Sequence, residues 1–183
     1  MIESESVDVS LQAIALKAGL TAPLIGYYFG GKEGLLRALA RRDTQRALTQ
    51  LRGLLAMELA PEEMLRIHVS GIIHNYARRP YLNALFNHLL RDETSASARE
   101  IKESFVEPLA AAQRDIIANG IAAGRFRAVD PTLAYFMIVG ACQYLFNNKI
   151  TVAGLLKGDL DDEGVDRYAR FVVDTLLKGL TVR

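Results

Sequence analysis

An amine group near the amino end of this chain stands at a position that suits phosphate binding. Lys32 begins the third of three short helical patterns, and Ser10 and Thr21 can cap the first two. Free backbone N–H groups at a helix start bind phosphate oxygens, and so does an ammonium group. The spacing therefore indicates contact with a nucleic acid rather than catalysis.

The elements that must position these groups form a predicted helix-turn-helix over residues 10–36. Ser10 is a good N-cap for a first helix, and the apolar positions after it keep the helical period: Leu11, Ile14, Ala15 and Ala18. Gly19 ends this helix, because glycine takes the left-handed conformation at little steric cost. A second helix held rigidly across the first can enter the major groove of DNA.

The second helix is predicted to begin after Thr21. Pro23 falls in its first turn, where the missing N–H would have no intrahelical partner. Its period predicts one set of residues that pack inward, namely Leu24, Ile25, Tyr28 and Phe29. It predicts another set that faces out, namely Ala22, Gly26 and Tyr27.

Several short motifs in this stretch occur together in a known order: Ile14-Ala15, Ala18-Gly19-Leu20-Thr21, Tyr28-Phe29 and Lys32-Glu33-Gly34-Leu35-Leu36. The stretch resembles the DNA-binding domain of the TetR/AcrR family of transcriptional regulators. The resemblance implies a recognition surface on or beside Thr21, Ala22, Pro23, Gly26, Tyr27 and Tyr28, with Ser10 and Lys32 on phosphates. Gly26 stands where the family often has a tyrosine that touches the DNA backbone, so this contact is lost or has moved to Tyr27.

The residues before Ser10 are few compared with the family. Its members have a complete first helix there, whereas residues 1–9 resemble only the tail of such a helix. We therefore expect a segment upstream of Met1 in the natural protein.

The rest of the chain is predicted to be helical, which makes the fold class all-α. The helices are expected over residues 32–57, 61–80, 81–90, 98–119 with a bend at Pro108, 131–146 and 165–180. We expect a DNA-binding domain over residues 1–45, and a helical domain for ligand binding and dimerisation over residues 46–183.

Two of these helices carry apolar stripes that suit association. The first consists of Leu133, Phe136, Met137, Gly140, Ala141, Tyr144 and Leu145, and the second of Val165, Tyr168, Ala169, Val172, Val173, Leu176 and Leu180. The resemblance implies a homodimer in which these last two helices of each subunit form a four-helix bundle. The alternative is that both stripes pack only within the subunit.

A small-molecule effector is the expected second partner. A helical domain binds such a ligand in an interior that is mostly apolar with a few polar groups. The candidate contacts are His68, Asn75, Phe86, His88, Phe105, Met137, Gln143 and Tyr144, although a core role is the simpler interpretation of each. No arginine cluster is present, so we expect an apolar or amphipathic ligand.

Other kinds of site find little support in the sequence. His68 and His74 are six residues apart, which places them on different faces of a helix, and no cysteine or carboxylate completes a zinc site with them. No phosphate loop or nucleophile motif is present, so no metal, cofactor or enzymatic activity is expected. A single cysteine fits a reducing cytoplasm. The longest apolar run, residues 133–146, is too short to span a membrane.

Two functions remain after this comparison. The first is a ligand-responsive regulator, most simply a repressor, that binds a palindromic operator on double-stranded DNA as a homodimer. The second is a helical small-molecule-binding or scaffolding protein whose DNA module has degenerated. Operator binding that weakens steeply with salt would distinguish the first from the second.

Overall fold

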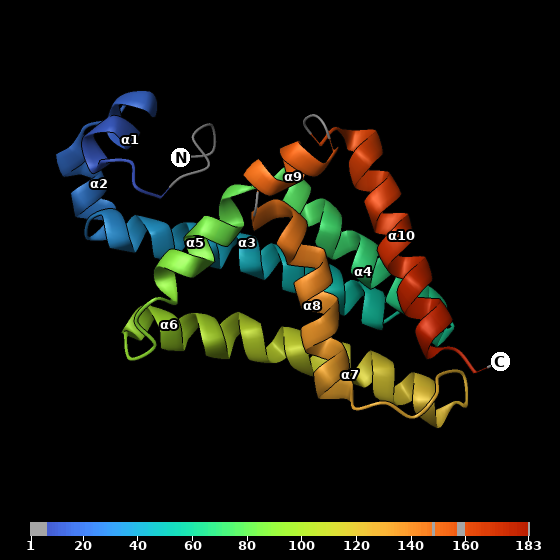
Figure 1. Cartoon of the computed structure of the whole chain (residues 1–183). Helices are drawn as coiled ribbons and strands as arrows, with labels where there is room; N and C mark the ends of the chain where they lie inside the picture. The colour runs from blue at the N-terminus through green and yellow to red at the C-terminus, as the bar shows by residue number, and fades with distance from the viewer. Residues whose placement is uncertain (1–6, 148, 157–159, 183) are drawn as a thin grey trace. The chain divides into compact units, whose positions relative to one another are not determined.

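The computed structural model describes residues 7–147, 149–156 and 160–182, and these residues fold almost entirely into helices (Figure 1). The elements are α1 (Leu11–Lys17), α2 (Ala22–Phe29), α3 (Lys32–Leu55), α4 (Pro61–Arg78), α5 (Tyr81–Leu89), α6 (Ala96–Ile101), the π-helical segment η1 (Lys102–Val106), α7 (Glu107–Ala122), α8 (Pro131–Asn147), α9 (Lys149–Leu156) and α10 (Asp162–Leu180). The all-α prediction is confirmed.

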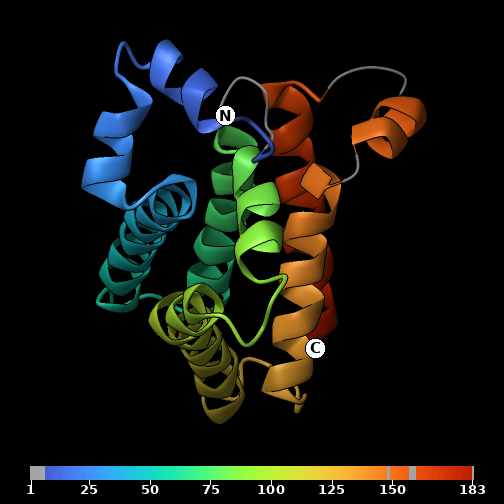
Figure 2. The same ribbon diagram turned by 90° about the vertical axis from the view of Figure 1, so that its left-hand side faces the viewer.

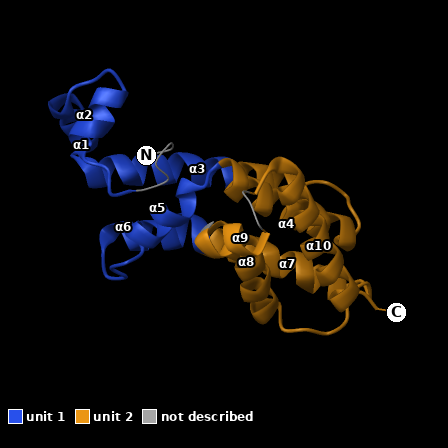
Figure 3. Ribbon diagram, turned by 45° about the horizontal axis from the view of Figure 1, so that its top comes forward, with its two compact units in different colours: residues 1–48, 79–106 blue, residues 49–78, 107–183 orange. Residues whose placement is uncertain are grey.

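The chain divides into two compact units (Figure 3). Unit 1 comprises Met1–Leu48 and Arg79–Val106, and unit 2 comprises Thr49–Arg78 and Glu107–Arg183. Unit 1 therefore contains the helix-turn-helix together with α5 and α6. The functional boundary at residue 45 is a separate matter and stays a prediction.

Helix ends in the described residues follow the capping chemistry of the sequence. Ser10 and Asp161 are N-caps whose side chains accept hydrogen bonds from the N–H groups of Ala13 and Gly164, at 3.2 Å and 2.8 Å. Asp130 accepts a bond of 2.7 Å from the N–H of Thr132 at the start of α8. Each bond satisfies a donor that the helix itself leaves free, which fixes where the helix begins.

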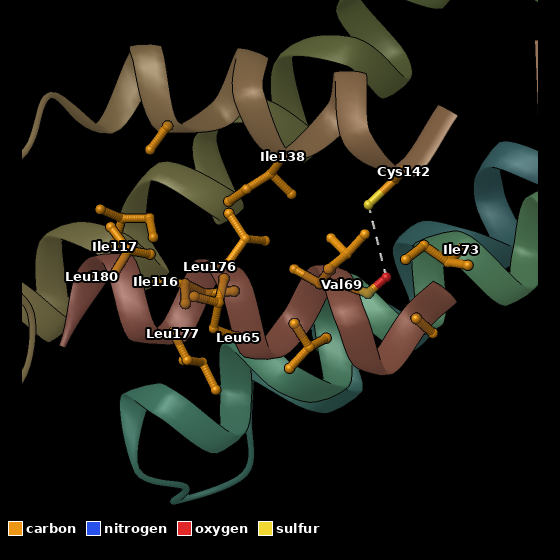
Figure 4. Close-up of a cluster of buried hydrophobic side chains, with 14 of the residues drawn as sticks. Leu65, Val69, Ile73, Ile116, Ile117, Ile138, Cys142, Leu176, Leu177 and Leu180 are labelled. Carbon is orange, nitrogen blue, oxygen red and sulfur yellow. Dashed lines mark hydrogen bonds between the residues drawn. The ribbon is translucent and has the colours of Figure 1, made fainter. Parts of the chain in front are cut away.

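The core of unit 2 is built around α4 (Figure 4). α7, α8 and α10 pack against it. The buried side chains of α4 include Leu65, Val69 and Ile73, which are at most 1% exposed. Complete burial of each such side chain stabilises the fold by roughly 1.5–3 kcal/mol. α4 is therefore the central helix of unit 2.

The predicted bend near Pro108 takes the form of a π-helical segment. η1 ends at Val106, two residues before the proline. Proline lacks the N–H that would bond the carbonyl four residues earlier, and its ring crowds that carbonyl. The wider π turn relieves this conflict, and the helix then continues as α7.

One element and one stripe differ from the sequence-based expectation. No helix is predicted between residues 146 and 165, yet this region contains α9. The apolar stripe of α10, which includes Val172, Val173 and Leu176, is buried within unit 2. The stripe of α10 is thus core, and the outer face of α8 is the one that stays exposed.

Candidate nucleic-acid interface

The helix-turn-helix is formed by α1, α2 and the start of α3. α1 packs against α2, and the turn between them depends on Gly19, whose φ is 67°. Ala15 of α1 and Ile25 of α2 are buried, at 2% and 4% exposure. These contacts fix the angle between the two helices, as groove recognition requires.

α2 presents two tyrosine rings to solvent. Tyr27 is 83% exposed and Tyr28 is 71% exposed, and the rings meet edge to face at a centroid distance of 5.3 Å. The expectation that Tyr28 packs inward is therefore wrong. Leu24 and Phe29 are also partly exposed, at 39% and 41%. Of the four side chains expected inward, only Ile25 is buried, because α2 is covered from one side alone.

The remaining predicted DNA contacts lie along the same module. Thr21 occupies the N-cap position of α2 but makes no side-chain cap bond, so its hydroxyl is available for a phosphate. Pro23 is exposed in the first turn of α2, and Ala22 and Gly26 are half-buried. Lys32 is the first residue of α3. Ser10 uses its hydroxyl to cap α1 and is otherwise exposed.

The close approach of α3 to α2 depends on Gly34. A Cβ at this position would run into the carbonyl oxygen of Phe29 at the end of α2. Only glycine permits this packing, and the packing brings Lys32 to the carboxyl end of α2. The sequence motif contains this glycine, but its spacing alone does not reveal the contact.

Hydrogen bonds and ion pairs join the start of α3 to α5 and α6 within unit 1. The carboxylate of Glu33 lies 3.3 Å from Nε2 of His88 and accepts a hydrogen bond of 3.4 Å from the hydroxyl of Ser97. Farther along α3, Arg41 pairs with Glu100 of α6. The helix that follows the recognition helix is thus joined by several bonds to the rest of its unit.

A buried carboxylate forms a second junction in unit 1. Asp43 accepts hydrogen bonds from the Tyr81 hydroxyl at 2.5 Å and from Arg42 at 3.0 Å, and Arg79 lies 3.8 Å away. Burial alone would raise the pKa of Asp43, but the bonds from Arg42 and Tyr81 and the positive charges outweigh it and lower the pKa. The sequence analysis missed this cluster, since Asp43 sits in a run of charged residues typical of a solvated face.

The predicted ligand contacts fall into both units. Phe86 and Phe105 stack in unit 1 at a centroid distance of 5.6 Å, and His88 bonds Glu33 there. Unit 2 holds His68, Asn75, Met137, Gln143 and Tyr144. Met137 and Tyr144 are 52% and 62% exposed on the outer face of α8, a placement that does not support a role in lining an interior site.

His68 and Gln113 form a buried polar pair inside unit 2. Nε2 of His68 lies 3.2 Å from Oε1 of Gln113, and burial lowers the pKa of His68 although the bond to Gln113 opposes this. The amide nitrogen of Gln113 is buried and has no hydrogen-bond partner. The pair therefore offers uncharged polar groups in apolar surroundings. Gln113 was missed, although a glutamine in register with Ile116, Ile117 and Gly120 is a polar residue at a core position.

The described residues contain no group of three or more side chains that could hold a metal ion. Within the same ranges, no helix has both the length and the apolar character needed to cross a lipid bilayer.

Comparison with known families gives two matches along this chain. Residues 5–39 match the family described as "Bacterial regulatory proteins, tetR family". Residues 58–183 match the family described as "Tetracyclin repressor-like, C-terminal domain". Among curated proteins no sequence match was found.

Solved structures with a similar fold include three regulators. A TetR/AcrR family transcriptional regulator from Thermobifida fusca is 26% identical with a TM-score of 0.73, and the match covers 93% of this chain and 86% of that one. The fatty acid degradation regulator FadR from Bacillus halodurans is 24% identical with a TM-score of 0.71, covering 96% and 90%. AibR, solved in complex with isovaleryl coenzyme A and operator DNA, is 19% identical with a TM-score of 0.74, covering 92% and 87%.

Proposed function

Because this chain belongs to the TetR family of bacterial regulatory proteins, we propose that it is a ligand-responsive repressor that binds a palindromic operator as a homodimer. The observation that carries the proposal is the presentation of α2. Its two tyrosines, Tyr27 and Tyr28, are exposed five and four residues before Lys32, and Gly34 permits the close packing of α3 on the end of α2. The tyrosine hydroxyls and the lysine ammonium suit phosphate contacts on either side of a major groove.

A homodimer places two recognition helices on one face of the duplex. The exposed apolar stripe of α8 supports association, since Leu133, Phe136 and Met137 are 67%, 65% and 52% exposed. The apolar stripe of α10 is buried in the core of unit 2 and is not free for association. The exposed side of α10 instead carries Phe171, which is 66% exposed. We propose that the dimer forms through these outer faces of α8 and α10.

Control by a ligand requires a link between the effector site and the recognition helix. The bonds of Glu33 to His88 and Ser97 join the start of α3 to α5 and α6. A ligand that binds one arrangement of α5 and α6 better than another shifts the population of DNA-binding conformations. We propose that α3 and α5 transmit this shift.

The effector is proposed to be apolar or amphipathic. The uncharged pair of His68 and Gln113 supports a ligand that carries a hydrogen-bonding polar group on an apolar body. FadR is a fatty acid degradation regulator, and AibR was solved in complex with isovaleryl coenzyme A. Fatty acids and acyl-coenzyme A esters are therefore suitable first probes.

The test is titration of the purified chain with the DNA upstream of its own coding region across a range of salt. We expect a steep negative dependence of log affinity on log salt and a preference for one palindrome. Lys32→Gln should reduce the salt slope by about one contact per subunit. Lys178 lies far along the sequence, in α10. Lys178→Gln is therefore the matched control, and it should leave the salt slope unchanged.

The ligand arm repeats the titration with palmitate and with isovaleryl coenzyme A. A regulator of the proposed kind loses operator affinity, by about tenfold or more, with a probe that it binds. A chain with neither salt-dependent nor sequence-specific binding would instead be a helical ligand-binding protein with a degenerate DNA module.

A further inference from the structure

The helix α2 and the turns beside it lack the side chains that identify bases by paired hydrogen bonds. Residues 18–31 contain no arginine, lysine, asparagine, glutamine, aspartate or glutamate. In the major groove, arginine and lysine bind the acceptors of guanine, asparagine and glutamine bind adenine, and the acidic residues bind cytosine. A helix without any of these groups must distinguish one sequence from another by a different kind of contact.

The free side of α2 consists mainly of carbon. In Figure 2, α1 and α2 are the two short blue helices joined by a tight turn, and α1 packs against α2. Ile25 is the buried residue of α2. Pro23 and Tyr27 each stand two positions from Ile25, which is about 200° around the helix, so they lie on the opposite side from it. Both are exposed.

These two side chains suit the 5-methyl group of thymine. Thymine is the one DNA base that carries a methyl group into the major groove, and proteins contact this group with apolar and aromatic carbon atoms. The ring of Pro23 has no hydrogen-bonding group, and the ring of Tyr27 can lie against a methyl group while its hydroxyl reaches a phosphate. Burial of one methyl group raises affinity by about fourfold.

Gly26 leaves room for such a contact. It lies three residues after Pro23, and residues three apart are neighbours on a helix surface. A Cβ at Gly26 would meet nothing within 4 Å, so packing within the subunit does not require glycine there. Apolar contact needs carbon atoms within about 4–4.5 Å of one another. The missing side chain lets the edge of a base come that close to Pro23.

We infer that α2 reads its operator through thymine methyl groups, and that Pro23 and Tyr27 are the residues that contact them. The inference rests on the proposed function and deepens it by naming the class of DNA sequence: half-sites that place thymine, on either strand, under these two side chains. Phosphate contacts, such as that of Lys32, position the helix but carry no information about the bases.

The first test uses the operator found by titration with the upstream DNA. Deoxyuridine in place of every thymine keeps the base pairing and removes only the methyl groups. We expect operator affinity to fall about tenfold or more, because each half-site loses at least one methyl contact. The factor should be the same at every salt concentration, because a methyl contact releases no counterions. An unrelated duplex of equal length, given the same replacement, should be bound as before.

A rescue experiment separates methyl contact from the shape of the duplex. The thymine·adenine pair whose replacement by uracil costs most is changed to cytosine·guanine, which should also weaken binding. 5-Methylcytosine·guanine at the same place returns a methyl group to the same part of the groove, so it should recover most of the lost affinity.

Protein variants identify the residues that make the contact. Pro23→Ala combined with Tyr27→Ala should lower the preference for the thymine operator over the uracil operator from about tenfold or more to about threefold or less. Alanine favours helix, and circular dichroism checks that α2 is kept. Lys32→Gln is the control. It removes a phosphate contact, so it should weaken binding to both operators by the same factor and leave the preference unchanged.

The outcomes separate the inference from the proposed function. A chain that selects one palindrome but binds its thymine and uracil forms equally overturns the inference and leaves the proposed function standing. A loss with uracil that 5-methylcytosine does not rescue also overturns it, because the shape of the duplex would then be read. An unchanged preference in the variant of Pro23 and Tyr27 overturns the assignment to these residues. A chain with no sequence preference overturns both proposals.

Discussion

At the scale of single residues, Gly34 sets the geometry of the DNA-binding module. Gly34→Ala forces a methyl group into the Phe29 carbonyl. We expect the free energy of unfolding to fall by about 1–3 kcal/mol and operator affinity to fall with it, because α2 and α3 must separate. Denaturant unfolding and operator titration measure the two effects.

The control for this substitution lies in the same module. Gly26 is in the middle of α2, and a Cβ there meets nothing within 4 Å. Gly26→Ala should stabilise the chain by about 0.5–1 kcal/mol through helix propensity. If both substitutions had the same sign, close packing at Gly34 would not be the cause.

Asp43 makes the stability of unit 1 sensitive to acid. Its pKa is lowered in the folded state, so its charged form stabilises the fold above the unfolded value of about 3.9, and this stability is lost as the pH falls through the lower folded value. Asp43→Asn should cost about 1–3 kcal/mol at pH 7. The difference from wild type should shrink below about pH 4. Urea unfolding at several pH values checks this, and a constant difference would contradict it.

At the scale of elements, the hydrogen bonds of Glu33 to His88 of α5 and Ser97 of α6 hold the start of α3 in place beside the helix-turn-helix. Glu33→Ala removes both bonds, and partly exposed bonds of this kind contribute about 0–1 kcal/mol. We expect amide hydrogens of α2 to exchange about twofold to fivefold faster, while those of α10 keep their rates. Equal acceleration in both helices would indicate global destabilisation instead.

The sequence predicts helices better than it predicts their exposed sides. Caps and prolines locate several helix starts, because these residues act within one turn, as Ser10 and Pro61 do. The start of α10 was missed by three residues, because the cap at Asp161 lies in a run of acidic residues. Burial depends on neighbours that are distant in sequence, which is why Tyr28 is exposed and the stripe of α10 is core. The polar partners Asp43 and Gln113 were missed for the same reason, since their bonds join helices far apart along the chain.

At the scale of the whole molecule, a two-fold dimer demands fixed spacing between operator half-sites. Inserting about five base pairs at the operator centre turns one half-site to the opposite face of the duplex. We expect affinity to fall by at least a hundredfold, to that of a single half-site, because the second module no longer engages at the same time. Gel-shift titration measures this, and unchanged affinity would mean that the two modules bind independently.

At the carboxyl end of α10, Thr181 and Val182 belong to the fold of unit 2. Phe126 is 2% exposed and pairs with Thr181 in an isolated bridge, and the N–H of Val182 donates to the carbonyl of Arg125 at 3.1 Å. A purification tag or reporter fused at this end would pull on a segment that closes over a buried aromatic ring. Fluorescent or affinity labels for following this protein in cells are therefore better carried on an exposed loop, such as the one around Glu93.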